Sequence, residues 1–113
     1  MPEQSLFLSV ATIAEMRLGV ERMSPGARRV RITHWLDEVL PRRFQDNILP
    51  VDIAVADLMG RLAARRLNEG RPMEAMDLII AATAEVHNLT LVTRNVSHFE
   101  GAVTSILNPW TRT

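Results

Sequence analysis

The chain has 113 residues, of which 47% are hydrophobic and 23% are charged, and this size and composition are typical of one globular domain rather than a disordered segment. Thirteen acidic residues balance thirteen arginines, with no lysine present, so the net charge of zero excludes a molecule-wide field that attracts nucleic acid. The absence of cysteine excludes disulfides and cysteine-bound zinc, and it is typical of a reducing compartment.

The hydropathy pattern gives no sign of a membrane or secreted protein. No run reaches the roughly eighteen apolar residues that a membrane span needs. The opening stretch MPEQSLFLSVATIAEMRL lacks the basic leader and long apolar core of a signal peptide. We therefore expect a cytoplasmic protein that has no membrane partner.

The first half of the chain begins with a short strand, which two helices follow. Residues 5–10, SLFLSV, predict a buried strand, and from Ala11 onward the apolar residues recur at helical spacing. A second helix is predicted to start at Ser24, as its N-cap, with Pro25 as the first helical residue. That helix should stop near Pro41, because proline disrupts a helix interior.

The middle of the chain repeats this order of a strand and two helices. Residues 47–52, NILPVD, predict a strand, and Asp52 is placed to cap a helix over residues 53–69. Gly70 is a suitable helix terminator. A further helix is predicted over residues 71–88.

The last part of the chain adds two strands. Residues 89–94, LTLVTR, and 102–107, AVTSIL, predict strands, with a single turn at 97–101 between them. Strands that alternate with helices indicate an α/β fold with a largely parallel sheet. In such folds the functional groups gather where the carboxyl ends of the strands meet the following helices.

Asp77 is the residue that most requires explanation, because it lies in the otherwise apolar stretch MDLIIAATAEV. An ionised carboxylate needs a compensating partner when it is buried. One interpretation is that the helix begins only at Leu78 and Asp77 caps it. The other is that Asp77 faces a cleft, where an arginine or a metal ion compensates it.

Four other residues are expected at the carboxyl edge of the sheet. Glu15 lies in the first turns of the helix that follows the first strand, at the border of its apolar face; alternatively it is a solvated residue that pairs with an arginine. Thr93, Arg94 and Asn95 end the strand LTLVT and should reach the same edge.

The segments FLSVATIAEMRLGVERM, NILPVD, MDLIIAATAEVHNLTLVTRNVSHFEG and ILNPW, in this order and spacing, resemble the PIN-domain family and, within it, the VapC/FitB-like toxins. The resemblance covers nearly the whole chain. It implies a single PIN-like domain over residues 1–113, which is an α/β/α sandwich with a mostly parallel sheet. It also implies a metal-dependent ribonuclease, the toxin of a toxin–antitoxin pair, whose carboxylates cluster around Mg²⁺ or Mn²⁺.

The resemblance assigns the metal ligands to Glu15 and Asp77. Carboxylate oxygens suit hard divalent cations, and such a cation activates water and neutralises charge on a scissile phosphate. A cation would also compensate Asp77. Asn95 is implied as a third catalytic residue, acting as an outer or weak ligand.

Three residues are expected to bind substrate: Thr93, Arg94 and His98. Arg94 is placed to contact a phosphate. His98 stands where many relatives carry an acid, and it is expected to be an improvised ligand or a proton carrier.

The sequence departs from the family pattern at its start. Family members open with a central strand of the type LLDTN, whose aspartate is the first metal ligand. This chain has no counterpart of that strand or of its aspartate. We therefore expect a PIN domain that lacks its first strand, through a miscalled start, a shortened chain or gene decay. Its absence would leave open strand edges that invite pairing with another chain.

Two functions follow as alternatives. The first is an endoribonuclease that hydrolyses RNA phosphodiester bonds, impaired by the truncation. The second is a catalytically silent PIN remnant that acts by binding its antitoxin or a second copy of itself. RNA, a cognate antitoxin and a homodimer or higher oligomer are thus the expected partners, and cation binding separates the two functions.

The helical arginines permit two interpretations. They form either an RNA-binding face or solvated helix faces balanced by neighbouring acids, and the sequence favours the second. The residues are Arg28, Arg29, Arg31, Arg42, Arg43, Arg61, Arg65 and Arg66.

Overall fold

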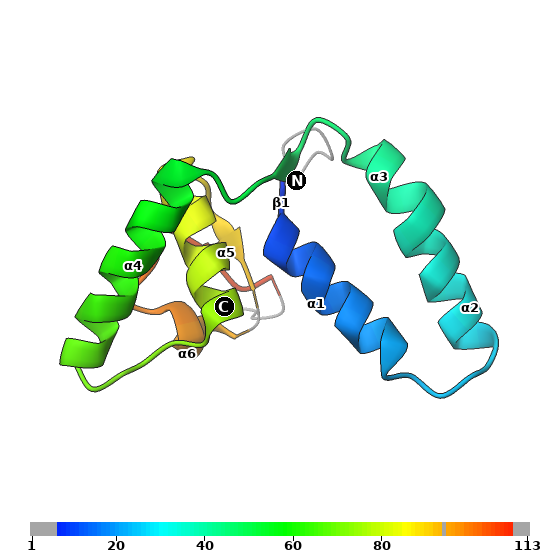
Figure 1. Ribbon diagram of the computed structural model, residues 1–113, viewed down its shortest axis with the longest axis horizontal. Helices are drawn as coiled ribbons and strands as arrows, with labels where there is room; N and C mark the ends of the chain where they lie inside the picture. The colour runs from blue at the N-terminus through cyan, green and yellow to red at the C-terminus, as the bar shows by residue number, and fades with distance from the viewer. Residues whose placement is uncertain (1–6, 94, 110–113) are drawn as a thin grey trace. The chain divides into compact units, whose positions relative to one another are not determined.

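The computed structural model describes residues 7–93 and 95–109, and the chain divides into two compact units, Met1–Pro50 and Val51–Thr113 (Figure 1). Each unit combines helices with one pair of short parallel strands. This arrangement confirms the predicted α/β class and the parallel direction of the strands. No helix in the described part of the chain is long and apolar enough to cross a membrane.

The first unit opens with β1 (Leu8–Ser9), which pairs in parallel with β2 (Ile48–Leu49). Helix α1 (Val10–Glu21) follows β1 without a loop. Ser9 makes this possible because its hydroxyl accepts the amide hydrogen of Ala11 at 3.1 Å and caps the helix. The predicted strand of residues 5–10 is thus shorter than expected within the described residues, because the helix begins at its last residue.

The second helical segment has three parts: α2 (Ala27–His34), the π-helical turn η2 (Trp35–Val39) and α3 (Leu40–Arg43). The segment ends at Arg43, so the prediction that it stops near Pro41 holds to within two residues. The ring of a proline clashes with the carbonyl four residues earlier in an α-helix. The chain widens to a π-turn just before Pro41, where the amide of Leu40 donates to the carbonyl of Trp35 five residues back, and the helix continues.

The predicted start of that segment is wrong. Gly26, rather than Ser24, is the N-cap, and the first helical residue is Ala27 rather than Pro25. Gly26 is in an extended conformation, with φ 159° and ψ 179°, which keeps Pro25 from joining the helix. The unit's core consists of Val20, Leu36 and Leu40, buried against partly buried neighbours from β1, α1, β2 and the second helical segment.

The second unit begins with α4 (Ile53–Asn68), whose boundaries agree with the prediction. The Asp52 carboxylate accepts the amide hydrogen of Val55 at 3.0 Å, as expected of an N-cap. Gly70 follows the helix with φ +70°, the left-handed conformation that ends many helices.

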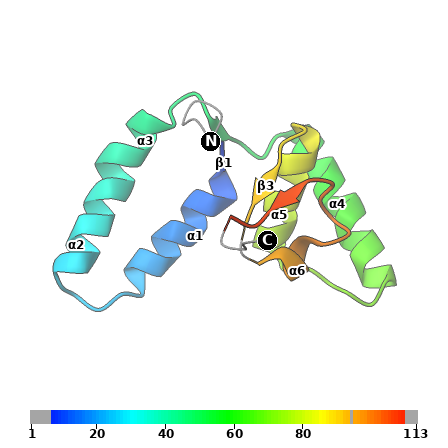
Figure 2. The same ribbon diagram turned by 180° about the vertical axis from the view of Figure 1, so that it is seen from behind.

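The other elements of this unit are α5 (Ala75–Val86), β3 (Leu91–Val92), α6 (Val96–Phe99) and β4 (Ile106–Leu107). Strands β3 and β4 pair in parallel. Figures 1 and 2, seen from opposite sides, agree that α5 lies between α4 and this strand pair. Its core is formed by Val55, Leu62, Leu78, Ala81, Ala82, Ala84, Phe99, Ala102 and Val103.

Candidate functional site

Asp77 lies inside α5 rather than at its cap. The helix begins at Ala75, after the extended residue Glu74, so Asp77 is the third helical residue and the N-cap interpretation is wrong. Its side chain is only 21% exposed. The first turn of a helix favours a carboxylate, because the free amide groups there carry partial positive charge. This provides part of the compensation that the sequence required.

His98 provides a second part of that compensation. Its Nδ1 lies 3.4 Å from Oδ2 of Asp77, and the contact is an ion pair whenever the imidazole is protonated. His98 is carried on α6, which is anchored by the neighbouring Phe99 in the core of the second unit. The structure thus brings together two of the residues expected to act in the site.

The Asp77–His98 pair borders a pocket of about 300 Å³ in the second unit. The pocket combines two carboxylates and an imidazole with two guanidinium groups. Its lining residues are Arg66, Arg71, Pro72, Met73, Glu74, Asp77, Ser97 and His98.

Arg66 is the pocket residue that the sequence interpretation placed wrongly. It was assigned to a solvated helix face, but it is only 3% exposed. Its Nε donates to the carbonyl of Arg71 at 3.1 Å and its Nη1 to the carbonyl of Glu100 at 2.6 Å. A signal existed in the sequence, because Arg66 follows Val55 and Leu62, both buried, at spacings that keep one helix face.

Two other arginines of α4 do match the solvated interpretation. Arg61 pairs with Asp57 at 3.0 Å and Arg65 with Glu69 at 4.0 Å, each one helical turn apart and well exposed. Exposed pairs of this kind contribute little to stability. Because the charges of Arg61 and Arg65 are balanced by acids on the same helix, these arginines do not by themselves indicate an RNA-binding face.

The remaining predicted residues lie elsewhere. Glu15 is exposed on α1 in the first unit, and its meeting with Asp77 stays a prediction. Asn95 is exposed at the start of α6, where its amide donates to the hydroxyl of Thr93 at 3.0 Å. Neither Thr93 nor Asn95 belongs to the pocket lining. Arg94 lies outside the described residues.

Two donors of the pocket are of types that divalent cations accept. Asp77 offers carboxylate oxygens and His98 an imidazole nitrogen, a combination that Mn²⁺ accepts more readily than Mg²⁺. Among the described residues, no group of three or more His, Cys, Asp or Glu side chains forms a metal site. The pair alone is therefore not a metal site, and cation binding at Asp77 stays a prediction.

Comparison with known proteins identifies the family. A family model described as PIN domain matches residues 3–101. Toxin FitB of Neisseria gonorrhoeae (strain ATCC 700825 / FA 1090) is 34% identical over 107 residues, which cover 95% of this chain and 77% of FitB. VapC ribonuclease Y4jK of Sinorhizobium fredii (strain NBRC 101917 / NGR234) is 37% identical over 108 residues, with coverages of 95% and 76%.

Solved structures agree with this assignment. A chain in the structure of FitAB bound to an IR36 DNA fragment is 31% identical, with a TM-score of 0.89, and the match covers 100% of this chain and 79% of that one. A chain of VapBC-5 from Mycobacterium tuberculosis, a member of the VapBC family of toxin–antitoxin systems, is 28% identical with a TM-score of 0.71, over 88% and 79%. The protein described here therefore belongs to the PIN domain family.

Proposed function

We propose that this chain is a metal-dependent endoribonuclease of the VapC toxin type, which hydrolyses RNA phosphodiester bonds. The observation that carries the proposal is the Asp77–His98 pair at the pocket of the second unit, in a chain of the PIN domain family. Relatives named as a toxin and as a ribonuclease support it.

In this proposal Asp77 holds a Mg²⁺ or Mn²⁺ ion with His98 as a weaker neighbour, while Glu15 and Asn95 stay predicted ligands. When bound, the cation would supply an activated water and would neutralise charge that develops on the phosphate. Asp77 orients the imidazole through its Oδ2, which leaves Nε2 of His98 as the nitrogen free to carry a proton. The free amide groups in the first turn of α5 carry partial positive charge beside the Asp77 carboxylate.

RNA cleavage by the purified chain in Mn²⁺ or Mg²⁺ tests the proposal. Asp77→Asn keeps the shape of the side chain but removes its charge, so we expect cleavage to fall by about a hundred-fold or more. Asp57→Asn is the matched control, because Asp57 is an exposed acid of α4 that pairs with Arg61. Full activity in Asp77→Asn, or in the presence of a chelator, would contradict the proposal.

The proposed partners are a cognate antitoxin and a second copy of the chain, acting in the cytoplasm. Solved relatives include a VapBC toxin–antitoxin system and FitAB bound to DNA, which supports an antitoxin partner. Co-expression with a candidate antitoxin chain, followed by co-purification of the two chains, checks this part of the proposal.

A second candidate function is a binding scaffold without catalysis. It is favoured by the finding that no three ligand-type side chains cluster among the described residues. A chain that is folded and binds its antitoxin, but cuts no RNA with either metal, would have this function.

A further inference from the structure

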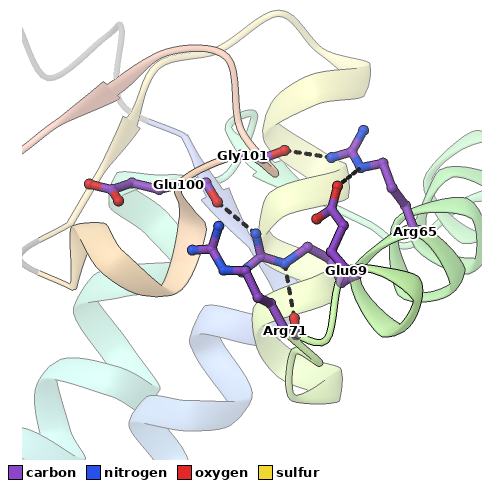
Figure 3. A network of polar contacts seen from close by, with 6 residues as sticks. Arg65, Glu69, Arg71, Glu100 and Gly101 are labelled. Atoms are coloured by element: carbon purple, nitrogen blue, oxygen red, sulfur yellow. Dashed lines mark hydrogen bonds and ion pairs between the residues drawn. The ribbon is translucent and has the colours of Figure 1, made fainter.

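Three arginines converge on the short segment Glu100–Gly101 that follows α6 (Figure 3). Nη2 of Arg65 donates to the carbonyl of Gly101 at 2.6 Å, and Nη1 of Arg66 donates to that of Glu100 at 2.6 Å. A Cβ added at Gly101 would lie 3.3 Å from Nη1 of Arg66 and 3.9 Å from Nη1 of Arg71. The guanidinium groups of Arg66 and Arg71 are therefore neighbours.

Among the described residues only one of these three arginines forms an ion pair, although the carboxylates of Glu74 and Asp77 line the same pocket as Arg66 and Arg71. Arg65 is paired with Glu69. Within the described part of the chain, no carboxylate forms an ion pair with Arg66 or Arg71. Figure 3 shows the carboxylate of Glu100 directed away from them, while its carbonyl accepts from the cluster.

The burial of Arg66 increases the effect of this charge. A guanidinium that is 3% exposed and bonded to neutral carbonyls is poorly screened by water. The exposed side chain of Arg71 lies beside it with no hydrogen-bond or ion-pair partner among the described residues. An anion at Arg71 would be attracted by both groups.

Both arginines line the same pocket as Asp77 and His98. The pocket thus has an acidic part, suited to a cation, and a guanidinium part, suited to an anion. Metal-assisted hydrolysis of RNA requires such a combination, because the chain of phosphates must be held beside the metal. Guanidinium groups match phosphate geometry with two parallel hydrogen bonds.

We propose that Arg71 binds a backbone phosphate of single-stranded RNA in this pocket, next to the phosphate that reacts. Arg66 acts as a positioning residue, because it holds the carbonyl of Arg71 and contributes its buried charge. Gly101, at φ +83°, leaves the space that the two guanidinium groups occupy. This inference rests on the proposed ribonuclease function and names how its substrate is held.

The experiment measures binding of a fluorescently labelled single-stranded RNA by anisotropy, in chelator and across a range of salt concentrations. Arg71→Ala should weaken binding about five-fold at about 0.1 M salt and lower the slope of log Kd against log salt by about 0.7, which is the loss of one phosphate contact. Arg71→Lys should restore most of the affinity, because it keeps the charge. Arg61→Ala is the matched control, since it removes an equal charge from an exposed pair.

The outcomes separate this inference from the proposed function. Equal RNA affinity for Arg71→Ala and Arg61→Ala would overturn the phosphate site, even where the wild type cleaves RNA. If the two variants bind RNA equally but Arg71→Ala binds a polyglutamate peptide more weakly, the pocket is a peptide site. That outcome would also overturn the phosphate site. Loss of RNA binding in Arg71→Ala, in a wild type that shows no cleavage with Mn²⁺, would support the phosphate site and contradict the ribonuclease. With active protein, Arg71→Ala should raise KM by a larger factor than it lowers kcat.

Discussion

At the scale of single residues, the pocket depends on one buried charge. Arg66 joins the end of α4 to the segment before α5 and to the segment after α6, through the carbonyls of Arg71 and Glu100. These are the segments that place Asp77 and His98. A guanidinium is suited to this role because its several donors have fixed directions.

Removal of Arg66 should therefore destabilise the protein. Arg66→Ala leaves two carbonyl oxygens without donors, each worth about 1–3 kcal/mol when buried, so we expect the free energy of unfolding to fall by about 2–4 kcal/mol. Urea unfolding followed by circular dichroism measures it. Arg61→Ala, which removes an exposed arginine, should change it by less than about 1 kcal/mol. Equal effects of the two substitutions would show that Arg66 is not the support described.

Part of this residue-scale detail could be predicted from the sequence. The compensation of Asp77 could be anticipated, because a carboxylate in an apolar stretch needs a partner. The contact of Asp77 with His98 could not be predicted, because it depends on how Phe99 packs in the core and thereby positions α6. Arg66 was misplaced because charged residues are seldom fully buried.

At the scale of elements, local signals predicted the helices well where a side chain defines their ends. Asp52 and Gly70 bound α4 as expected, because capping and left-handed termination need only neighbouring residues. The predicted strands are longer than the observed ones, because each described strand pairs over two residues only. Strand length depends on hydrogen bonds to a partner strand, which local sequence does not specify. The π-turn before Pro41 was missed because proline usually ends a helix.

The capping role of Asp52 gives a prediction at this scale. Asp52→Ala should lower the free energy of unfolding by about 1 kcal/mol, because the amide of Val55 loses its acceptor. Asp52→Asn keeps an oxygen in the same place and should lose only a few tenths of that amount. Thermal or urea unfolding of both variants tests it, and equal stability of Asp52→Ala and the wild type would contradict it.

At the scale of the whole molecule, the order of strands and helices was enough to predict the α/β class and its parallel strands. The family followed from the motifs around Asp77, which span the second unit's α5, β3 and α6. The ligand set of Glu15, Asp77 and Asn95 stays a prediction, because Glu15 and Asp77 belong to different units and Asn95 is outside the pocket lining. A resemblance assigns ligands by their position in the sequence, whereas a metal site requires the ligand atoms to lie close together in space.

The account as a whole depends on whether Asp77 holds a divalent cation, and titration of Mn²⁺ into the purified chain measures this most directly. We predict that the wild type binds Mn²⁺, that Asp77→Asn weakens binding by about ten-fold or more, and that Asp57→Asn leaves it unchanged. Circular dichroism of the three proteins should show the same helical content. Binding of Mn²⁺ by Asp77→Asn with wild-type affinity, or no binding by the folded wild type, would contradict the account.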